Sequence, residues 1–403
     1  MSPTILILAV AAAAGVPDAS SVTFAKDIAP IFQRSCQACH RPGEAAPMPL
    51  LTYADARPFA RSIKKNVEQH EMPPWHADPA HGEWKNDRRL PDADVKKIVA
   101  WVDAGAPEGD PKDLPPPEKF TDGWNIHSSE NNGSPDVVFK IPKEYTVKAK
   151  GEVPYQYFVV PTGFTEDKWV QAAEARPGNR AVVHHIIVFI QEPEQAGLGQ
   201  GGSLWKTHLC GTAPGEEADA FPPGTAKRIR AGSKLIFQMH YTPSGKEERD
   251  QSSVGIVFAG EPVRHEMRIQ GVMTQRFNIP AGASAHEVQS SYTFKEDSTL
   301  WALMPHMHVR GKDFRYEIVY PDGRRDVALN VPRWDFNWQH NYIFKQPLKV
   351  PSGTRLECTA HYDNSAANKA NPDPTKDVRW GDQTWEEMMI GFVSFTKDNQ
   401  RVF

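Results

Sequence analysis

The chain has 403 residues, a formal net charge of −4 and 24% charged residues. This length predicts two or three domains and more than one hydrophobic core. The charge balance argues against a nucleic-acid partner, because proteins that bind nucleic acids carry a basic surface for the phosphates. The 35 prolines and 28 glycines favour loop-rich β structure over a helical bundle.

The N-terminus carries an apolar run that ends in small residues, as in a secretory signal peptide. We place this signal at residues 1–20. The run is shorter than the roughly 20 residues that a membrane span needs, which leaves a membrane anchor as the weaker alternative. We therefore expect a periplasmic or otherwise extracytoplasmic protein with no membrane insertion after signal removal.

The stretch Cys36-Gln37-Ala38-Cys39-His40 has the spacing of a c-type haem attachment site. The two thiols of such a site bond covalently to the haem vinyl groups, and the histidine takes one axial position on the iron. One covalent haem c is therefore expected. Met72 is the favoured second axial ligand, because it ends a helical pattern and two prolines follow it. The alternatives are Met48, His70 and His76.

Residues 21–107 are expected to form a small all-α cytochrome c domain around this motif. Apolar residues recur at helical spacing over residues 24–32, 54–71 and 92–104. Gly105 and Pro107 then stop the last helix. Residues 108–135 combine prolines, charges and turn residues without hydrophobic periodicity, which predicts a linker.

From residue 136 onward, short β-rich runs alternate with turns, which is typical of all-β sandwiches. The region is long for one sandwich, so we expect two, over residues 136–265 and 266–403. The expected strands lie at residues 157–160, 181–190, 234–241, 299–304, 315–320, 354–362 and 389–395.

Histidines cluster in this second region. Residues i and i+2 of a strand share a face, so His306 and His308 can hold one metal ion. Adjacent His184 and His185 point to opposite faces of a regular strand, so both reach one ion only where the strand bulges or ends. Imidazole and thioether ligands without a carboxylate favour copper, whereas a hydrolytic zinc site more often includes a carboxylate or a nearby base. Each histidine taken alone is equally consistent with a core position.

The order of the motifs His-His, His-Tyr, His-x-His and Glu-Glu-Met resembles the copper type II, ascorbate-dependent monooxygenases. That family includes peptidylglycine α-hydroxylating monooxygenase and dopamine β-monooxygenase, and its bacterial type carries an N-terminal c-type cytochrome domain. The resemblance covers residues 136–403. It implies two jelly-roll-like sandwiches that each hold one copper ion and face each other across an open solvent cleft.

The resemblance also implies two sets of copper ligands. They are His184, His185 and His240 for the first ion, and His306, His308 and Met388 for the second. In the family the first copper stores and delivers an electron, and the Met-ligated copper binds O₂ and attacks the C–H bond, so the second set is catalytic.

The expected function is therefore a copper-dependent monooxygenase with two copper ions, whose electrons arrive through the fused haem. Its expected partners are a small-molecule substrate, O₂ and an external electron donor, either an ascorbate-like reductant or another redox protein. The alternative is a non-enzymatic periplasmic electron-transfer or copper-binding protein.

Some positions depart from the family pattern. Met304 and Phe392 stand where peptide-hydroxylating members have an arginine and a tyrosine that hold the carboxylate of the substrate. Their loss predicts a neutral or apolar substrate. Met389 replaces a cysteine that is bridged in the family, so Cys358 cannot form that disulfide. A bridge from Cys358 to Cys210 and a pair of buried free thiols both remain open.

Overall fold

The computed structural model describes residues 22–44, 46–120, 123–126, 134–195, 207–212, 218–400 and 402. The predicted signal peptide lies outside these ranges, as does part of the predicted linker. No helix in the described ranges is long and apolar enough to cross a membrane. The chain divides into two compact units, which we call the helical unit (residues 1–73 and 89–119) and the β unit (residues 74–88 and 120–403).

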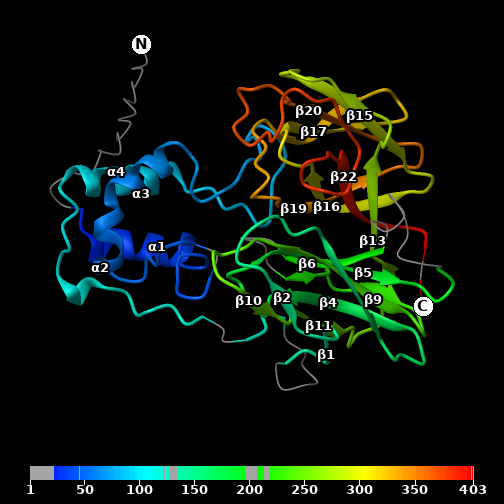
Figure 1. Ribbon diagram of the computed structural model, residues 1–403, viewed down its shortest axis with the longest axis horizontal. Helices are drawn as coiled ribbons and strands as arrows, with labels where there is room; N and C mark the ends of the chain where they lie inside the picture. Colours follow the sequence, from blue (N-terminus) through cyan, green and yellow to red (C-terminus); the bar gives the residue numbers. More distant parts are fainter. Residues whose placement is uncertain are drawn as a thin grey trace, which may run out of the picture. The chain divides into compact units, whose positions relative to one another are not determined.

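The helical unit contains short helices around one core, drawn in blue to cyan in Figure 1. Their bounds are a π-helical turn Phe24–Ile28, α1 (Ala29–Ser35), α2 (Tyr53–Ala56), a 3₁₀ turn Arg57–Phe59, α3 (Ala60–Glu68) and α4 (Asp92–Asp103). The expected helices are confirmed, but the second is broken at Pro58, which lacks the N–H group that a helix interior requires. Phe32 and Trp101 are fully buried at the centre of the core.

The first half of the β unit has two main sheets. The first sheet has the strand order β1 (Val137–Lys140), β11 (Ser253–Phe258), β4 (Lys168–Arg176), β8 (Thr225–Ile229) and β12 (His265–Glu266), and the short strand β7 (Asp219–Ala220) also pairs with β4. The second sheet has the strand order β3 (Gln156–Pro161), β9 (Lys234–Tyr241), β5 (Val183–Gln191) and β6 (His208–Thr212). A small pair, β2 (Tyr145–Val147) with β10 (Glu248–Asp250), completes it. Apolar residues from both main sheets share one core, so that core lies between the sheets.

The second half of the β unit repeats this arrangement. Its strands are β13 (Arg268–Met273), β22 (Ile390–Lys397), β16 (Ser298–His306) and β19 (Tyr342–Val350) in one sheet, β15 (His286–Thr293), β20 (Arg355–Tyr362), β17 (Gly311–Val319) and β18 (Arg325–Val331) in the other, and the pair β14 (Asn278–Ile279) with β21 (Val378–Arg379). A second core lies between the two main sheets. The chain leaves the first half after β12 and enters the second half at β13.

All seven expected strands are present, so a helical region followed by mainly β structure is confirmed. The sequence did not reveal β4, β11 or β19 as strands. In β4 the central Ala172 to Ala175 stretch has low strand propensity. It forms a strand because it lies between β11 and β8 with both faces covered, where small side chains fit.

Residues 74–88 belong to the β unit although the sequence places them inside the expected cytochrome c domain. Trp75 and Trp84 are each only 5% exposed and lie in the core of the second half. The Asp78 backbone N–H donates to Asn330 of β18, and the Lys85 N–H donates to Ile343 of β19, both at 2.8 Å. This segment therefore pairs with the edge strand of each sheet, and edge pairing removes exposed backbone groups from solvent.

Candidate metal centre

A strand irregularity brings three histidines together at one end of β5 and β9. The pairing register places Val183 opposite Tyr241 but His185 opposite His240, so His184 is an extra residue in β5. A bulge of this kind lets neighbouring side chains turn to the same side. The strand therefore bulges here, which is one of the two arrangements that let both histidines reach one ion, and the ligand atoms of His184, His185 and His240 all lie within 4.8 Å of one another.

These three histidines, which we call the three-histidine group, have the chemistry of a metal site. Burial lowers the pKa of each ring, to about 3 for His240, so the imidazoles are neutral and can act as ligands at neutral pH. Nε2 of His185 and Nδ1 of His240 are buried, and neither has a hydrogen-bond partner within the described residues. Buried nitrogens without partners are costly unless something binds them. The group could hold a metal ion.

The second expected set, His306, His308 and Met388, lies where β16 ends beside the start of β22. His306 and His308 point to the same side with ring centroids 5.3 Å apart, while Met307 between them faces the core. The strand pairing sets His306 opposite Ile390, two residues after Met388. The His308 ring also contacts this chain segment, because its Nδ1 lies 3.1 Å from the carbonyl oxygen of Glu386. We call these three residues the His/Met group.

Hydrogen bonds orient each member of the His/Met group. The Nδ1 of His306 lies 2.6 Å from Oε1 of Gln339, and the carbonyl of Met388 accepts a 2.7 Å bond from the hydroxyl of Tyr362. An acceptor at Nδ1 places the ring proton there and leaves the lone pair on Nε2, as in most metal-ligating histidines. Burial lowers the pKa of His306 to about 4 and that of His308 to about 3.

A buried carboxylate holds the two chain segments of the His/Met group together. Glu387 is fully buried and accepts backbone N–H bonds from His308 at 2.8 Å and from Arg310 at 2.7 Å. The Arg310 guanidinium is also buried and donates to Asn364 and to the Trp385 carbonyl. Burial raises the pKa of Glu387 to about 8, against the opposing effect of the two N–H donors and of Arg310. The network fixes the backbone on both sides of the histidine and methionine ligand positions.

The two groups adjoin each other within the β unit. The Phe336 ring stacks on His184 at 5.8 Å and meets His308 edge-on at 6.1 Å. An apolar cluster of Phe189 and Ile236 with Met388 continues this contact between the two halves. Aromatic and apolar side chains therefore contact both groups.

The two positions that depart from the family pattern face each other across β16 and β22. Met304 pairs directly with Phe392, and both belong to the apolar cluster around Met388. The Phe392 ring also lies 6.4 Å from that of His306. The surface beside the His/Met group is therefore apolar where the family holds a charged substrate group.

The predicted haem-attachment motif begins directly after α1. The N–H groups of Cys39 and His40 both donate to the Cys36 carbonyl, so the motif coils into a single turn. Cys36 and Cys39 form no disulfide, and Cys36 packs against the helical core. Nδ1 of His40 lies 3.0 Å from the Met48 carbonyl, which leaves the lone pair on Nε2.

The structure separates the four candidates for the second axial ligand. The backbone carbonyl of Met48 lies 3.0 Å from Nδ1 of His40, so the Met48 backbone is tied to the proximal histidine. His76 is buried in the β unit, where its ring lies 6.5 Å from that of His340. Met72 and His70 both lie in the helical unit, just after α3.

Cys210 and Cys358 are buried and form no disulfide. Cys210 lies in the core of the first half of the β unit and Cys358 in the core of the second half. The possible bridge between them is therefore not formed. A Cβ atom on Gly391 would lie 2.4 Å from the Cys358 sulfur, so that thiol fills the space beside β22.

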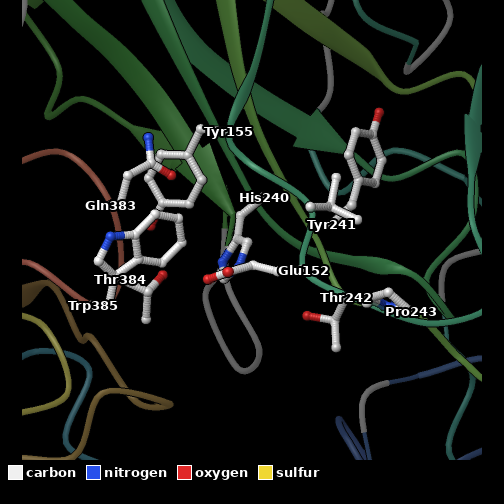
Figure 2. Close-up of a pocket in the computed structure, with 11 residues that line it drawn as sticks. Glu152, Tyr155, His240, Tyr241, Thr242, Pro243, Gln383, Thr384 and Trp385 are labelled. Atoms are coloured by element: carbon white, nitrogen blue, oxygen red, sulfur yellow. The ribbon is translucent and has the colours of Figure 1, made fainter. Parts of the chain in front are cut away.

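A pocket of about 160 Å³ opens beside the three-histidine group (Figure 2). Its walls come from the chain before β3, the end of β9 and the loop before Met388. The Tyr155 ring lies 4.9 Å from His240 and 5.4 Å from His185, and its hydroxyl bonds to the side chain of Thr384.

Sequence reasoning missed Tyr155, Gln339, Phe336 and Glu387. Gln339 and Phe336 lie in an aromatic-rich stretch, and Glu387 lies beside Met388, but only the tertiary contacts show what each residue does.

Comparisons with known proteins identify no relative. No family model matches the chain, and no curated protein matches it. Solved structures with similarity include PNGF-II, at 10% identity over 70% of this chain and 65% of that one, with a TM-score of 0.28. The VP2 subviral particle of infectious bursal disease virus matches at 7% identity over 67% and 74%, with a TM-score of 0.20. A xanthan lyase from Paenibacillus matches at 11% identity over 72% and 28%, with a TM-score of 0.18.

Proposed function

We propose that the chain is an exported copper-dependent monooxygenase. It hydroxylates a C–H bond of a neutral or apolar small molecule with O₂, and its electrons arrive through a fused c-type haem from an external donor. The observation that carries the proposal is the bulge at His184, which gathers three neutral imidazoles next to the His/Met group. We also propose that the helical unit is a cytochrome c domain and that the β unit consists of two jelly-roll-like sandwiches.

The donor atoms favour copper over other metals. Six neutral ligands, five imidazoles and one thioether, suit an ion that is stable as Cu(I), and no carboxylate is among them. When bound, the two copper ions would supply redox cycling and the activation of O₂. His184, His185 and His240 would hold the first ion, and His306, His308 and Met388 would hold the second.

The chain's own residues prepare both sites for metal. Burial keeps all five rings unprotonated, so no proton has to be displaced near neutral pH before a ligand atom is available. Gln339 and the Glu386 carbonyl fix two of these rings through Nδ1. Such outer hydrogen bonds restrict the rotation of the ring and raise the basicity of the ligand nitrogen.

The surroundings of the His/Met group support a substrate without charge. Met304 and Phe392 form an apolar surface next to His306, where an anionic group would lose its hydration without gaining a charged partner. This apolar surface also limits the access of water to the His/Met group. Limited access of water favours a reaction in which electrons must be delivered only when the substrate is bound.

The helical unit supports attachment of one haem c. The Cys36 and Cys39 thiols lie one turn apart, and His40 offers Nε2 for the proximal axial position. Met72 is the proposed distal ligand, because it lies just after α3 in the helical unit and two prolines follow it. Histidine and methionine ligation suits electron transfer, and covalent attachment of haem c fits the proposed location outside the cytoplasm.

The test uses full-length protein matured with haem and loaded with copper. A panel of neutral small molecules is screened for substrate-dependent O₂ uptake and for incorporation of one ¹⁸O atom from labelled O₂. We expect His308→Ala and Met388→Ala each to lower the rate at least 100-fold, because each removes a ligand of the site where oxygen is activated. His81→Ala, in the segment 74–88 and outside the contacts described for either group, is the matched control and should keep the activity of the parent protein.

Oxygen uptake that persists in both ligand variants would overturn the monooxygenase proposal. A protein that binds two copper ions and reduces its haem reversibly, but incorporates no ¹⁸O into any member of the panel, would instead be the non-enzymatic electron carrier.

A further inference from the structure

The pocket beside the three-histidine group has two aromatic walls. Tyr155 packs on His240, and Trp385 also lines the pocket with 40% of its surface exposed. Figure 2 shows both rings on the same side of His240. Exposed tryptophan next to a half-buried tyrosine offers faces on which a flat ring can stack.

The size of the pocket limits what it can take. A cavity of about 150 Å³ in another protein binds a single benzene ring. The volume here is about 160 Å³, which is enough for one six-membered ring with one or two small substituents. A peptide or a lipid chain would extend well beyond it.

Polar groups inside the pocket point to hydroxyl substituents on that ring. Thr242 and Thr384 carry hydroxyl groups, Gln383 carries an amide, and Glu152 carries a carboxylate that accepts hydrogen bonds. A phenolic hydroxyl can donate to the carboxylate and accept from the amide. A few placed polar groups in an otherwise aromatic site are the usual means of fixing a ligand's orientation.

The charges around the pocket disfavour an anion. None of its eleven lining residues is lysine or arginine. Glu152 lines it, Asp382 acts electrostatically on Tyr155, and Glu386 lies next to Trp385. These carboxylates offset the charge of any ion on the three-histidine group, so an anionic ligand gains no net attraction.

We propose that this pocket binds a small, uncharged, hydroxylated aromatic compound, a phenol or benzenediol. The inference rests on the proposed function, because it names the class of molecule that meets the copper sites. Such a compound differs from the ascorbate-like donor that the sequence led us to expect, because ascorbate is an anion at neutral pH and is not aromatic.

The test measures binding, so it does not depend on turnover. Resorcinol is titrated into full-length protein with haem and reduced copper, and binding is followed by calorimetry. We expect saturable binding of one molecule per chain. Trp385→Ala should weaken it at least 10-fold, and Thr384→Val should weaken it 3-fold or more. Phe59→Ala removes an equally exposed aromatic ring from the helical unit and should leave the affinity unchanged.

Competing ligands test separately whether the pocket requires a flat ring and whether it excludes an anion. Cyclohexane-1,3-diol carries the same hydroxyl groups without a flat ring, and it should bind at least 10-fold more weakly than resorcinol. Ascorbate should not displace resorcinol. Equal binding of the cyclohexane diol, displacement by ascorbate, or an affinity unchanged by both pocket substitutions would overturn the proposal, even if the chain proves to be a monooxygenase.

A second measurement separates the two roles that such a compound can have. Hydroquinone is incubated with the holoprotein and ¹⁸O₂. As an electron donor, each molecule loses two electrons and two protons, the electrons reduce two Cu(II) ions to Cu(I), and benzoquinone without ¹⁸O is released. As a substrate, the ring gains one ¹⁸O atom as a new hydroxyl group, and an external donor supplies two electrons. Either product supports binding in the pocket if its formation falls at least 10-fold in Trp385→Ala, and a product that Trp385→Ala forms equally fast contradicts it.

Discussion

The three-histidine group and the His/Met group differ in how firmly the surrounding chain holds them. In the His/Met group, hydrogen bonds from Gln339, Glu386 and Tyr362 reach all three ligand residues. In the three-histidine group the rings contact one another, Tyr155 and Phe336, and two buried nitrogens have no partner in the described part of the chain. The chain itself therefore fixes the His/Met group by hydrogen bonds, whereas it leaves ligand atoms of the three-histidine group without partners.

The largest effect should come from Glu387→Ala. The substitution leaves the buried N–H groups of His308 and Arg310 without an acceptor. Each buried donor left without a partner costs about 1–3 kcal/mol, so we expect a loss of about 2–6 kcal/mol. The free energy of unfolding of copper-free protein, from urea denaturation, measures this loss.

The exposed Glu261→Gln is the control for Glu387→Ala and should change that free energy by less than about 0.5 kcal/mol. A loss below about 1 kcal/mol in Glu387→Ala would show that the His/Met group is not held by this network.

The next effect concerns copper affinity alone. Gln339→Ala removes the acceptor at Nδ1 of His306, and losing such an outer partner lowers metal affinity about 10–100-fold. Competition with a Cu(I) chelator measures the two sites separately. We expect only the His/Met site to weaken. Equal weakening of both sites would mean that the two groups do not differ in their support.

A smaller effect is expected from Tyr362→Phe. The lost hydroxyl leaves the buried Met388 carbonyl without this donor, which costs about 1–2 kcal/mol. Unfolding of the copper-free protein measures it. Tyr292→Phe in strand β15, where the side chain is partly buried, should cost less than half as much, and a reversed order would contradict the role given to Tyr362.

The smallest effect should follow Tyr155→Phe. The ring contacts with His185 and His240 persist, and only the bond to Thr384 is lost. We expect the copper affinity of the three-histidine group to change less than about 3-fold, as for loss of one partly exposed hydrogen bond. The same chelator competition measures it, and a 10-fold change would show that this group too is held by an outer hydrogen bond.

Much of the fold could be predicted because local pattern and tertiary environment agree. Short β-rich runs between turns marked β16 and β20, and a histidine pair that binds one ion required either a strand end or the bulge that occurs at His184. The strand β4 could not be predicted, since its alanines favour a strand only once neighbouring strands cover both faces. The residues that orient the ligands lie outside the motifs, and Gln339 becomes relevant only because folding sets it against His306, 33 positions away.

The location of residues 74–88 changes where the protein can be divided. The chain passes between the two units three times, after residues 73, 88 and 119. A protease that cuts only the proline-rich stretch after residue 107 would leave the two units joined by two covalent connections. A recombinant fragment starting at residue 120 would lack Trp75 and Trp84, and the loss of either buried side chain costs about 3–5 kcal/mol. An expression fragment of the β unit should therefore retain residues 74–88, for example by joining them to residue 120 through a short designed loop.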